Sequence, residues 1–196
     1  MSFITDLSDP KNALIGDSDD AAKLKIGEHE LWLPKKHLAY QSPFFAGLFK
    51  NNFKEGADSC YDLKGLGDLK LQELLQFIGI VHGLDMPVNG TLLLFHLRAF
   101  HICFTAISAE GLLHLADLFQ CKVVLRRCEN YLRQTVDKRF PLSKKLLLCD
   151  RFKLNTLLIE MVDKISVEEW KKLHLPSGIS PLLASLVMQK FRLFDL

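Results

Sequence analysis

Apolar and polar side chains alternate along residues 22–33. Leu24 and Ile26 alternate with Lys23 and Lys25, and apolar residues resume at the same spacing after a glycine-containing turn at 27–28. A period of two is typical of a strand that buries one face, so this pattern predicts a β-hairpin. A further short strand is predicted at 60–63.

The stretch that follows the hairpin, residues 31–55, predicts a strand end, two short helices and an exposed turn. Ser42 is a favourable N-cap and Pro43 is favourable at the first helical position, so a helix is expected from residue 44 to residue 50. Its apolar side chains recur at helical spacing and predict a buried wall. They are Phe44, Phe45, Leu48 and Phe49.

Spacings of three and four residues predict helices in the middle of the chain. One is expected to begin at an Asp68 cap and to stop at His82-Gly83. Two more are expected between residues 110 and 132, with a break near Gln120-Cys121. The apolar stripe of the first of these two comprises Leu112, Leu113, Leu115, Ala116 and Phe119.

From residue 137 onward the pattern is helical throughout. Helices are expected over 143–152, 155–165 and 181–194, and a shorter one is expected to end at Leu173. Ser166 and Glu169 stand three residues apart at the start of that shorter helix, which is the spacing of a capping box.

Composition limits the classes of function. The chain has 196 residues, of which 48% are hydrophobic and 24% are charged, enough for one domain and a smaller appendage with a packed core. A net charge of +2 with scattered basic pairs gives no reason to expect a nucleic-acid partner. The N-terminus lacks the features of a secretory signal, and five separated cysteines suggest free thiols. We therefore expect a cytoplasmic or nuclear protein.

Residues capable of catalysis or metal binding form no convincing constellation. A nucleophilic triad could be written with Cys121, His114 and Asp117, but the last two lie on an ordinary amphipathic helix and no oxyanion hole is evident. No His and Cys spacing fits a structural zinc site, and the glycines at 65 and 67 lack the context of a nucleotide loop. We expect no enzyme, no cofactor and no metal.

Several of these segments together resemble the BTB (POZ) domain family. The resemblance covers about residues 20–134 and implies an α+β fold, a small sheet flanked by a helical cluster. Residues 135–196 resemble the helical, BACK-like extension of nematode-type MATH-BTB proteins, without a MATH domain, and 1–19 form an N-terminal arm. The matching segments are Leu38-Ala39, Ser42-Pro43-x-Phe45, Leu48-Phe49, Phe53-Lys54-Glu55, 111–119, 127–132 and, for the extension, 148–152.

The resemblance implies a non-enzymatic adaptor. In cullin-recruiting members an apolar-x-glutamate turn contacts the cullin three scaffold of a ubiquitin ligase, and Phe53-Lys54-Glu55 stands at that position. In the alternative interpretation, Phe53 only fastens the turn to the core and Glu55 is solvated. The residues expected at the cullin contact are Phe49, Asn52, Phe53, Lys54, Glu55, Phe119 and Gln120.

Members of this family also form dimers through their first strand and helices, so a homodimer or a heterodimer with another BTB protein is expected. A module that only dimerises and recruits no cullin is the alternative function. The arm at 1–19 could supply a strand that docks on another surface, such as that of a second copy, or it could be disordered.

An apolar segment at 91–109 departs from the family pattern. It could be an extra helix, a foreign insertion such as translated intervening sequence, or a membrane span. The last is disfavoured because Arg98 lies near the centre of a segment that is short for a bilayer. We expect no membrane contact.

Overall fold

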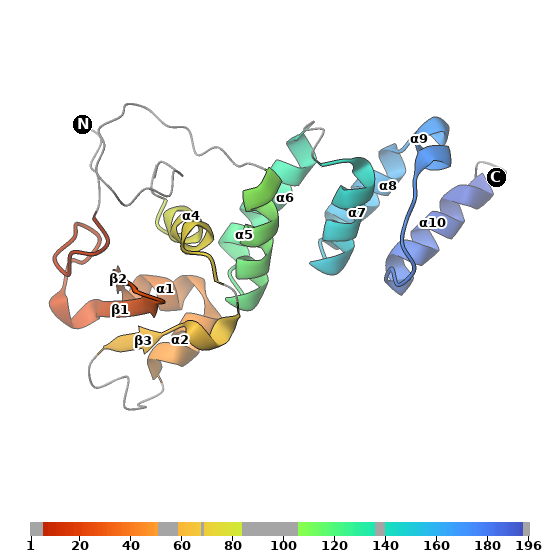
Figure 1. The fold of residues 1–196 in the computed structure, drawn as a ribbon. Coiled ribbons are helices and arrows are strands. Elements are labelled where there is room, and N and C mark those ends of the chain that lie inside the picture. The colour runs from red at the N-terminus through yellow and green to blue at the C-terminus, as the bar shows by residue number, and fades with distance from the viewer. Residues whose placement is uncertain (1–5, 51–58, 68, 84–105, 136–139, 194–196) are drawn as a thin grey trace, which may run out of the picture. The chain divides into compact units, whose positions relative to one another are not determined.

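The computed structural model describes residues 6–50, 59–67, 69–83, 106–135 and 140–193. The chain divides into two compact units, residues 1–125 and 126–196, and helix α6 (Lys122–Gln134) begins in the first and continues in the second. The fold is mixed α+β: a three-stranded sheet with helices, followed by an all-helical extension (Figure 1). This confirms the predicted fold class. The predicted boundary near residue 134 stays a prediction.

The sheet of the first unit is built on the predicted hairpin. Strand β1 (Ala21–Ile26) pairs antiparallel with β2 (His29–Pro34), and β3 (Cys60–Asp62) pairs parallel with β1 on its other side. The strand order is therefore β2-β1-β3. Gly27 turns the hairpin with a φ of 58°, a conformation that glycine adopts without steric penalty.

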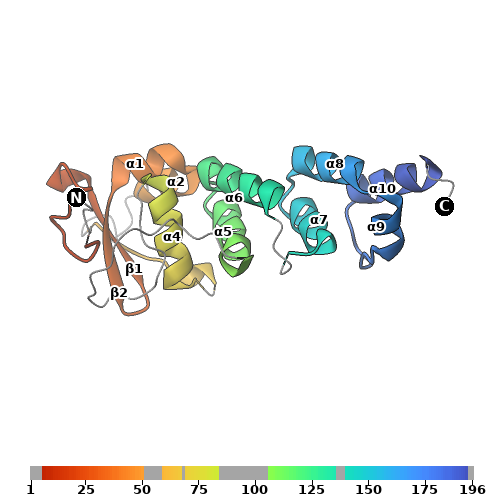
Figure 2. The ribbon, with the colours of Figure 1, turned by 90° about the horizontal axis from the view of Figure 1, so that it is seen from above.

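Within the described residues the sheet is accompanied by helices α1 (Lys35–Gln41), α2 (Pro43–Lys50), α4 (Leu71–Val81) and α5 (Ala106–Leu118), with short 3₁₀ turns η1 (Ser18–Asp20) and η2 (Lys64–Leu66). Helix α1 packs on α2, and α4 packs on α5. Figure 2 shows α4 between the sheet and α5. The largest fully buried side chains of this unit are Leu24, Leu31, Leu33, Leu38, Phe45, Leu74, Phe77, Ile78, Leu112, Leu113 and Phe119.

The two ends of α4 are capped differently from each other. The predicted stop at His82-Gly83 is confirmed: Gly83 has a φ of 61° and its N–H donates to the Ile80 carbonyl. The predicted start is wrong, because the N-cap is Lys70, which makes no side-chain capping bond. Asp68 itself lies outside the described residues.

Two histidines join α1 to the end of α4. The His37 and His82 rings stack with centroids 4.5 Å apart. The His37 Nε2 lies 2.9 Å from the Val81 carbonyl oxygen, and because a carbonyl only accepts, that nitrogen carries the proton. The His82 Nε2 is buried and has no hydrogen-bond partner within the described part of the chain. Burial, and secondarily the neighbouring His37, lowers the pKa of His82 to about 4.

The N-terminal arm packs on this chain's own sheet. Residues 6–17 form turns rather than a strand, and Leu7 is 2% exposed. The Trp32 N–H donates to the Leu7 carbonyl at 2.7 Å, and the Asn12 side-chain amide donates to the Trp32 carbonyl at 3.0 Å. The arm thus uses the outward backbone groups of edge strand β2, which would otherwise be open to another strand. The expected docking strand and the expected disorder are both wrong for these residues.

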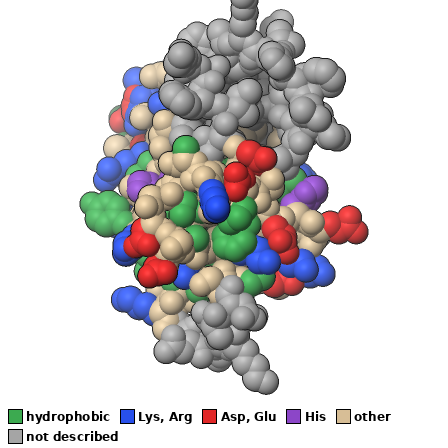
Figure 3. All heavy atoms as spheres, turned by 90° about the vertical axis from the view of Figure 1, so that its left-hand side faces the viewer, with side chains coloured by type: hydrophobic (Ala, Val, Ile, Leu, Met, Phe, Trp, Pro, Cys, Tyr) green, Lys and Arg blue, Asp and Glu red, His purple; other side chains and the backbone are tan. Residues whose placement is uncertain are grey.

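On the face of the first unit shown in Figure 3, acidic and basic side chains are interspersed, and apolar side chains appear as separate spots. Mixed charge of this kind is typical of a solvated surface.

The second unit is a cluster of helices, α7 (Leu142–Arg151), α8 (Asn155–Lys164), α9 (Val167–Lys172) and α10 (Pro181–Leu193), joined to the end of α6. Helix α8 packs against both α7 and α10. The predicted capping box is confirmed: Ser166 Oγ accepts from the Glu169 N–H, and the Glu169 carboxylate accepts from the Ser166 N–H at 3.0 Å. The Ser180 hydroxyl caps α10 by accepting a hydrogen bond from the Leu183 N–H. The Ser180 N–H in turn donates to the Asp150 carboxylate of α7 at 2.8 Å.

Most of the apolar segment at 91–109 lies outside the described residues. Its last four positions, 106–109, form the first turn of α5, and Ala109 is fully buried. In the described ranges, no helix combines the length and hydrophobicity that crossing a bilayer requires.

Candidate partner-binding surface

The end of α5 and the start of α2 meet in an aromatic cluster. The Phe119 ring lies 4.9 Å from the Phe45 ring, 5.1 Å from Phe44 and 5.1 Å from Phe77, measured between centroids. Such separations are typical of favourable aromatic pairs. Phe119 is 0% exposed and Phe45 is 1% exposed, so the cluster is the packed centre of the first unit.

The side-chain hydroxyl of Ser42 holds this cluster together by bonding to backbone groups of Phe45 and Phe119. The hydroxyl accepts a hydrogen bond from the Phe45 N–H at 3.2 Å, as the N-cap prediction requires, and it donates to the Phe119 carbonyl at 2.5 Å. Ser42 is 1% exposed, so the hydroxyl fulfils both roles away from water. One side chain therefore links the N-terminus of α2 to the C-terminus of α5.

The C-terminus of α5 is closed by a Schellman motif. The Gln120 N–H donates to the Asp117 carbonyl at 3.1 Å, and the Cys121 N–H donates to the Ala116 carbonyl at 2.8 Å. Gln120 adopts a φ of 52°, a left-handed conformation that is uncommon for a residue with a Cβ. Its side chain is exposed directly beside the buried Phe119.

Phe49 lies on the last turn of α2 and is partly exposed. Its ring stacks on Phe45 at 5.8 Å and meets Tyr61 of β3 at 5.0 Å in an edge-to-face arrangement. Phe49 thus extends the aromatic cluster toward the surface at the point where the described helix ends, at Lys50. The remaining residues of the expected surface, Asn52, Phe53, Lys54 and Glu55, lie outside the described residues.

The structure corrects one expected contact. The resemblance predicts that Phe119 faces the cullin, but a side chain with no exposed area cannot touch a partner while the domain stays folded. The physical reason is its position on the apolar stripe of α5, which packs inward with Leu112, Leu115 and Ala116. The structure therefore keeps Phe49 and Gln120 as candidate contacts and assigns Phe119 to the core.

The bond from Ser42 to Phe119 is the feature that sequence reasoning missed. Ser42 was identified only as a local cap, whereas its second partner lies 77 residues further along the chain. The sequence signal available was the serine itself: a buried hydroxyl needs both an acceptor and a donor, so a second, distant partner could have been sought.

Most of the cysteine thiols within the described residues are buried. Burial raises the pKa of the Cys121 thiol and raises those of Cys128 and Cys149 to about 12, which keeps each in its unreactive neutral form. His114 and Asp117 are exposed on α5, whereas Cys121 is buried. Among the residues searched, no group of three His, Cys, Asp or Glu side chains is placed to hold a metal ion.

The described residues form a small mixed α+β domain with a helical extension, and comparisons with known proteins identify two similar chains. The chain is 24% identical over 144 residues to "BTB and MATH domain-containing protein 15" of Caenorhabditis elegans, covering 73% of this chain and 44% of that protein. It is 25% identical over 134 residues to "BTB and MATH domain-containing protein 38" of the same organism, covering 68% of this chain and 29% of that protein.

The chain thus spans less than half the length of each of these relatives. No family model matches it. At this level of identity, the chain is similar to BTB-containing proteins over about two thirds of its length.

Proposed function

We propose that this chain is a non-enzymatic adaptor that binds the cullin three scaffold of a ubiquitin ligase through the turn that follows α2. The contacting residues in this proposal are Phe49, Asn52, Phe53, Lys54 and Glu55, joined by Gln120. The protein would act in the cytoplasm or the nucleus.

The observation that carries the proposal is the double hydrogen bond of Ser42. A recognition turn is effective when it is held in its bound geometry before the partner arrives, since less ordering entropy is then lost on binding. Ser42 fixes the start of α2 to the end of α5, and Phe49 packs the last turn of α2 on Phe45 and Tyr61. Residues 51–55 therefore follow a helix that is anchored at both ends.

The chemistry of the turn supports a protein partner. An aromatic side chain such as Phe53 supplies a large apolar area with few rotatable bonds, and Glu55 offers a carboxylate at the edge of the contact. Gln120 adds an exposed amide on the helix end that Ser42 ties to α2.

The test is a titration of the purified full chain with the cullin three N-terminal domain. Phe53→Ala is expected to weaken binding by about 2 kcal/mol or more if the ring is an anchor. Tyr40→Ala is the matched control, because it removes an aromatic side chain of similar size from α1, outside the proposed contact. Equal affinity of the wild type and Phe53→Ala would place the contact elsewhere, and no measurable affinity in the wild type would refute the proposal.

The second candidate function is a BTB module that assembles only with itself or with another BTB protein. One observation favours it: Tyr40 on α1 is 85% exposed, and exposed aromatic side chains are enriched at protein interfaces. Light scattering separates the two functions. If Tyr40 contributes to a dimer, Tyr40→Ala lowers the measured mass toward the 22.3 kDa of one chain without changing cullin affinity.

A further inference from the structure

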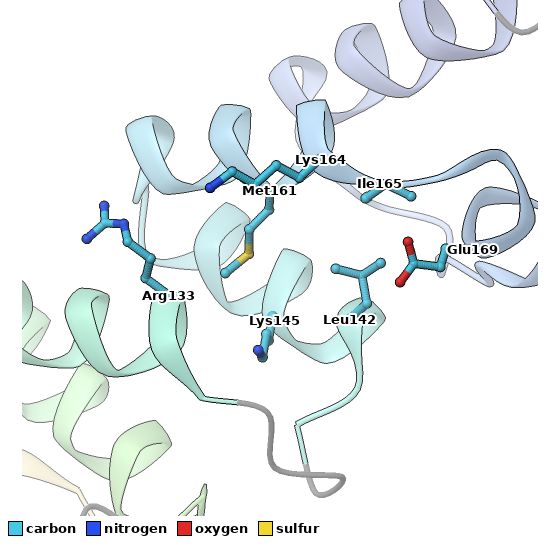
Figure 4. Close-up of a pocket in the computed structure, with 7 residues that line it drawn as sticks. All are labelled: Arg133, Leu142, Lys145, Met161, Lys164, Ile165 and Glu169. Carbon is cyan, nitrogen blue, oxygen red and sulfur yellow. The ribbon is translucent and has the colours of Figure 1, made fainter.

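The second unit contains a pocket that is lined by apolar side chains, three cationic side chains and one carboxylate. The pocket has a volume of about 190 Å³ and lies where α6, α7, α8 and α9 converge (Figure 4). Its apolar lining comes from Leu142, Met161 and Ile165. Its charged lining comes from Arg133, Lys145, Lys164 and Glu169.

Two of the three cations already have carboxylate partners. Arg133 pairs with Glu129 at 3.1 Å and with Glu160 at 3.0 Å, and Lys164 pairs with Glu160 at 2.7 Å. The Glu169 carboxylate is held by its capping-box bonds to the Ser166 N–H and hydroxyl. Figure 4 shows Glu169 on the opposite side of the pocket from Arg133.

Lys145 differs from these residues. Its ammonium donates to the backbone carbonyl of Thr135, and no carboxylate of the described residues lies within ion-pairing distance of it. An ammonium has three donor hydrogens, so two remain available. Lys145 is half-buried, so its charge is partly removed from water, and this burial lowers the pKa of its ammonium. An anion placed beside it would restore that lost solvation.

The charge of the chain favours an acidic ligand at this unit. Residues 126–196 contain 14 lysines and arginines against 8 aspartates and glutamates, a net charge of +6, whereas residues 1–125 contain 11 against 15, a net charge of −4. Charge separated in this way steers an acidic partner toward the second unit and away from the first.

We propose that this pocket binds an acidic peptide segment of a partner protein, with a side-chain carboxylate on Lys145 and a neighbouring apolar side chain against Met161 and Leu142. The volume suits one or two side chains and not a drug-sized molecule, whose pockets measure roughly 300 to 1,000 Å³. The inference rests on the adaptor function and supplies its second surface: the first unit engages the ligase scaffold, and this pocket selects the client.

The probe is a fluorescent twelve-residue peptide of alternating Glu and Leu, and its matched copy carries Gln in place of every Glu. Anisotropy is measured with the full chain at low salt. The acidic peptide is expected to bind at least tenfold more tightly than the Gln copy, and Lys145→Gln is expected to remove at least tenfold of that affinity. Lys145→Arg is expected to keep most of the affinity, because it preserves the charge.

The control variant is Lys171→Gln, which removes the same charge from an exposed position of α9 that does not line the pocket. Its affinity for the acidic peptide is expected to stay within twofold of the wild type. Circular dichroism establishes that Lys145→Gln is folded. Asp137 lies outside the described residues, so the titration is repeated in Asp137→Asn to exclude competition from that carboxylate.

Equal binding of the two peptides, equal losses in Lys145→Gln and Lys171→Gln, or no binding in both the wild type and Asp137→Asn would overturn the proposal. Cullin affinity is measured on the same samples. It should be unchanged in Lys145→Gln, so a failure of the peptide site is distinguishable from a failure of the adaptor function.

Discussion

The Ser42 hydroxyl donates a hydrogen bond to the Phe119 carbonyl while it accepts one from the Phe45 N–H. Ser42 is 1% exposed, so neither of these backbone groups can exchange this partner for bulk water. The side chain thus caps α2 and attaches it to the end of α5. This arrangement holds the helix from which the proposed recognition turn departs.

Ser42→Ala should therefore destabilise the first unit by more than an ordinary cap loss. Loss of an N-cap costs about 1 kcal/mol, and a buried carbonyl left without its donor adds about 1 to 3 kcal/mol. We expect a total of roughly 2 to 4 kcal/mol in urea unfolding, with an unchanged m-value. Ser185→Ala, at an exposed position of α10, is the control and should stay within about 0.5 kcal/mol. Equal effects of the two substitutions would mean that the link contributes nothing.

Gln120→Gly separates backbone strain from recognition. Gln120 adopts a left-handed conformation that glycine adopts without penalty, so the variant should be as stable as the wild type or more stable by up to about 1 kcal/mol. If its exposed amide contacts the cullin, the same variant should bind the cullin more weakly. Thermal unfolding and a cullin titration measure the two effects. A loss of stability above about 1 kcal/mol would contradict the strain argument.

The sequence predicted the parts of the fold that depend on local pattern. The alternation at Leu24 and Ile26 predicted the hairpin, and the spacing of Ser166 and Glu169 predicted the start of α9. The structure confirms both predictions. Phe119 is instructive because its periodicity placed it in the buried stripe, whereas the resemblance placed it at a partner surface. The structure agrees with the periodicity, since the spacing along a helix directly determines which face is buried.

Features that depend on distant contacts were not predictable in the same way. The arm docks on the backbone groups of Trp32, which any residue would offer, so nothing in the sequence indicates that the Leu7 carbonyl and the Asn12 side chain bind at this strand. The Lys70 start of α4 lacks a side-chain cap and hence lacks a sequence signal. In the candidate site, the local cap at Ser42 was predicted, but its bond across 77 residues was not. The contacts at 52–55 stay predictions.

Acid should destabilise the first unit through His82. In the unfolded chain this imidazole titrates near its ordinary value of 6.5, and in the folded chain its pKa is about 4. Between these values the unfolded state binds more protons than the folded state. The contribution of neutral His82 to the free energy of unfolding is therefore fully present above pH 6.5 and is lost as the pH drops toward 4. Each unit of the pKa difference corresponds to about 1.4 kcal/mol of stability. Because His82 is partly exposed, we reduce the full value and expect the free energy of unfolding to fall by about 2 kcal/mol over that interval.

Chemical denaturation between pH 7 and pH 4 measures this slope in the wild type and in His82→Leu, in which it should be shallower. A titration of the His82 ring followed by NMR supplies the direct check, with an expected midpoint near pH 4. A midpoint near 6.5 would remove the basis of the prediction.

Gly111 and Glu73 should be energetically coupled. A Cβ on Gly111 of α5 would overlap the Glu73 carboxylate of α4, which also pairs with Lys70 at 3.4 Å. In a Glu73→Ala background that overlap is gone, so Gly111→Ala should stabilise the protein by up to about 1 kcal/mol through helix propensity. In the wild-type background the displaced carboxylate should cancel part or all of that gain. A double-mutant cycle measures the coupling, and identical effects of Gly111→Ala in both backgrounds would show that the close approach has no energetic consequence.

The most direct measurement of the adaptor account is hydrogen exchange of the full chain with and without the cullin three N-terminal domain. The account predicts slower exchange in peptides that span the end of α2 and residues 51–55, with a second protected region at Gln120, and unchanged exchange in α8 and α10. Protection confined to α1 or to the second unit, or no protection at a saturating cullin concentration, would contradict it.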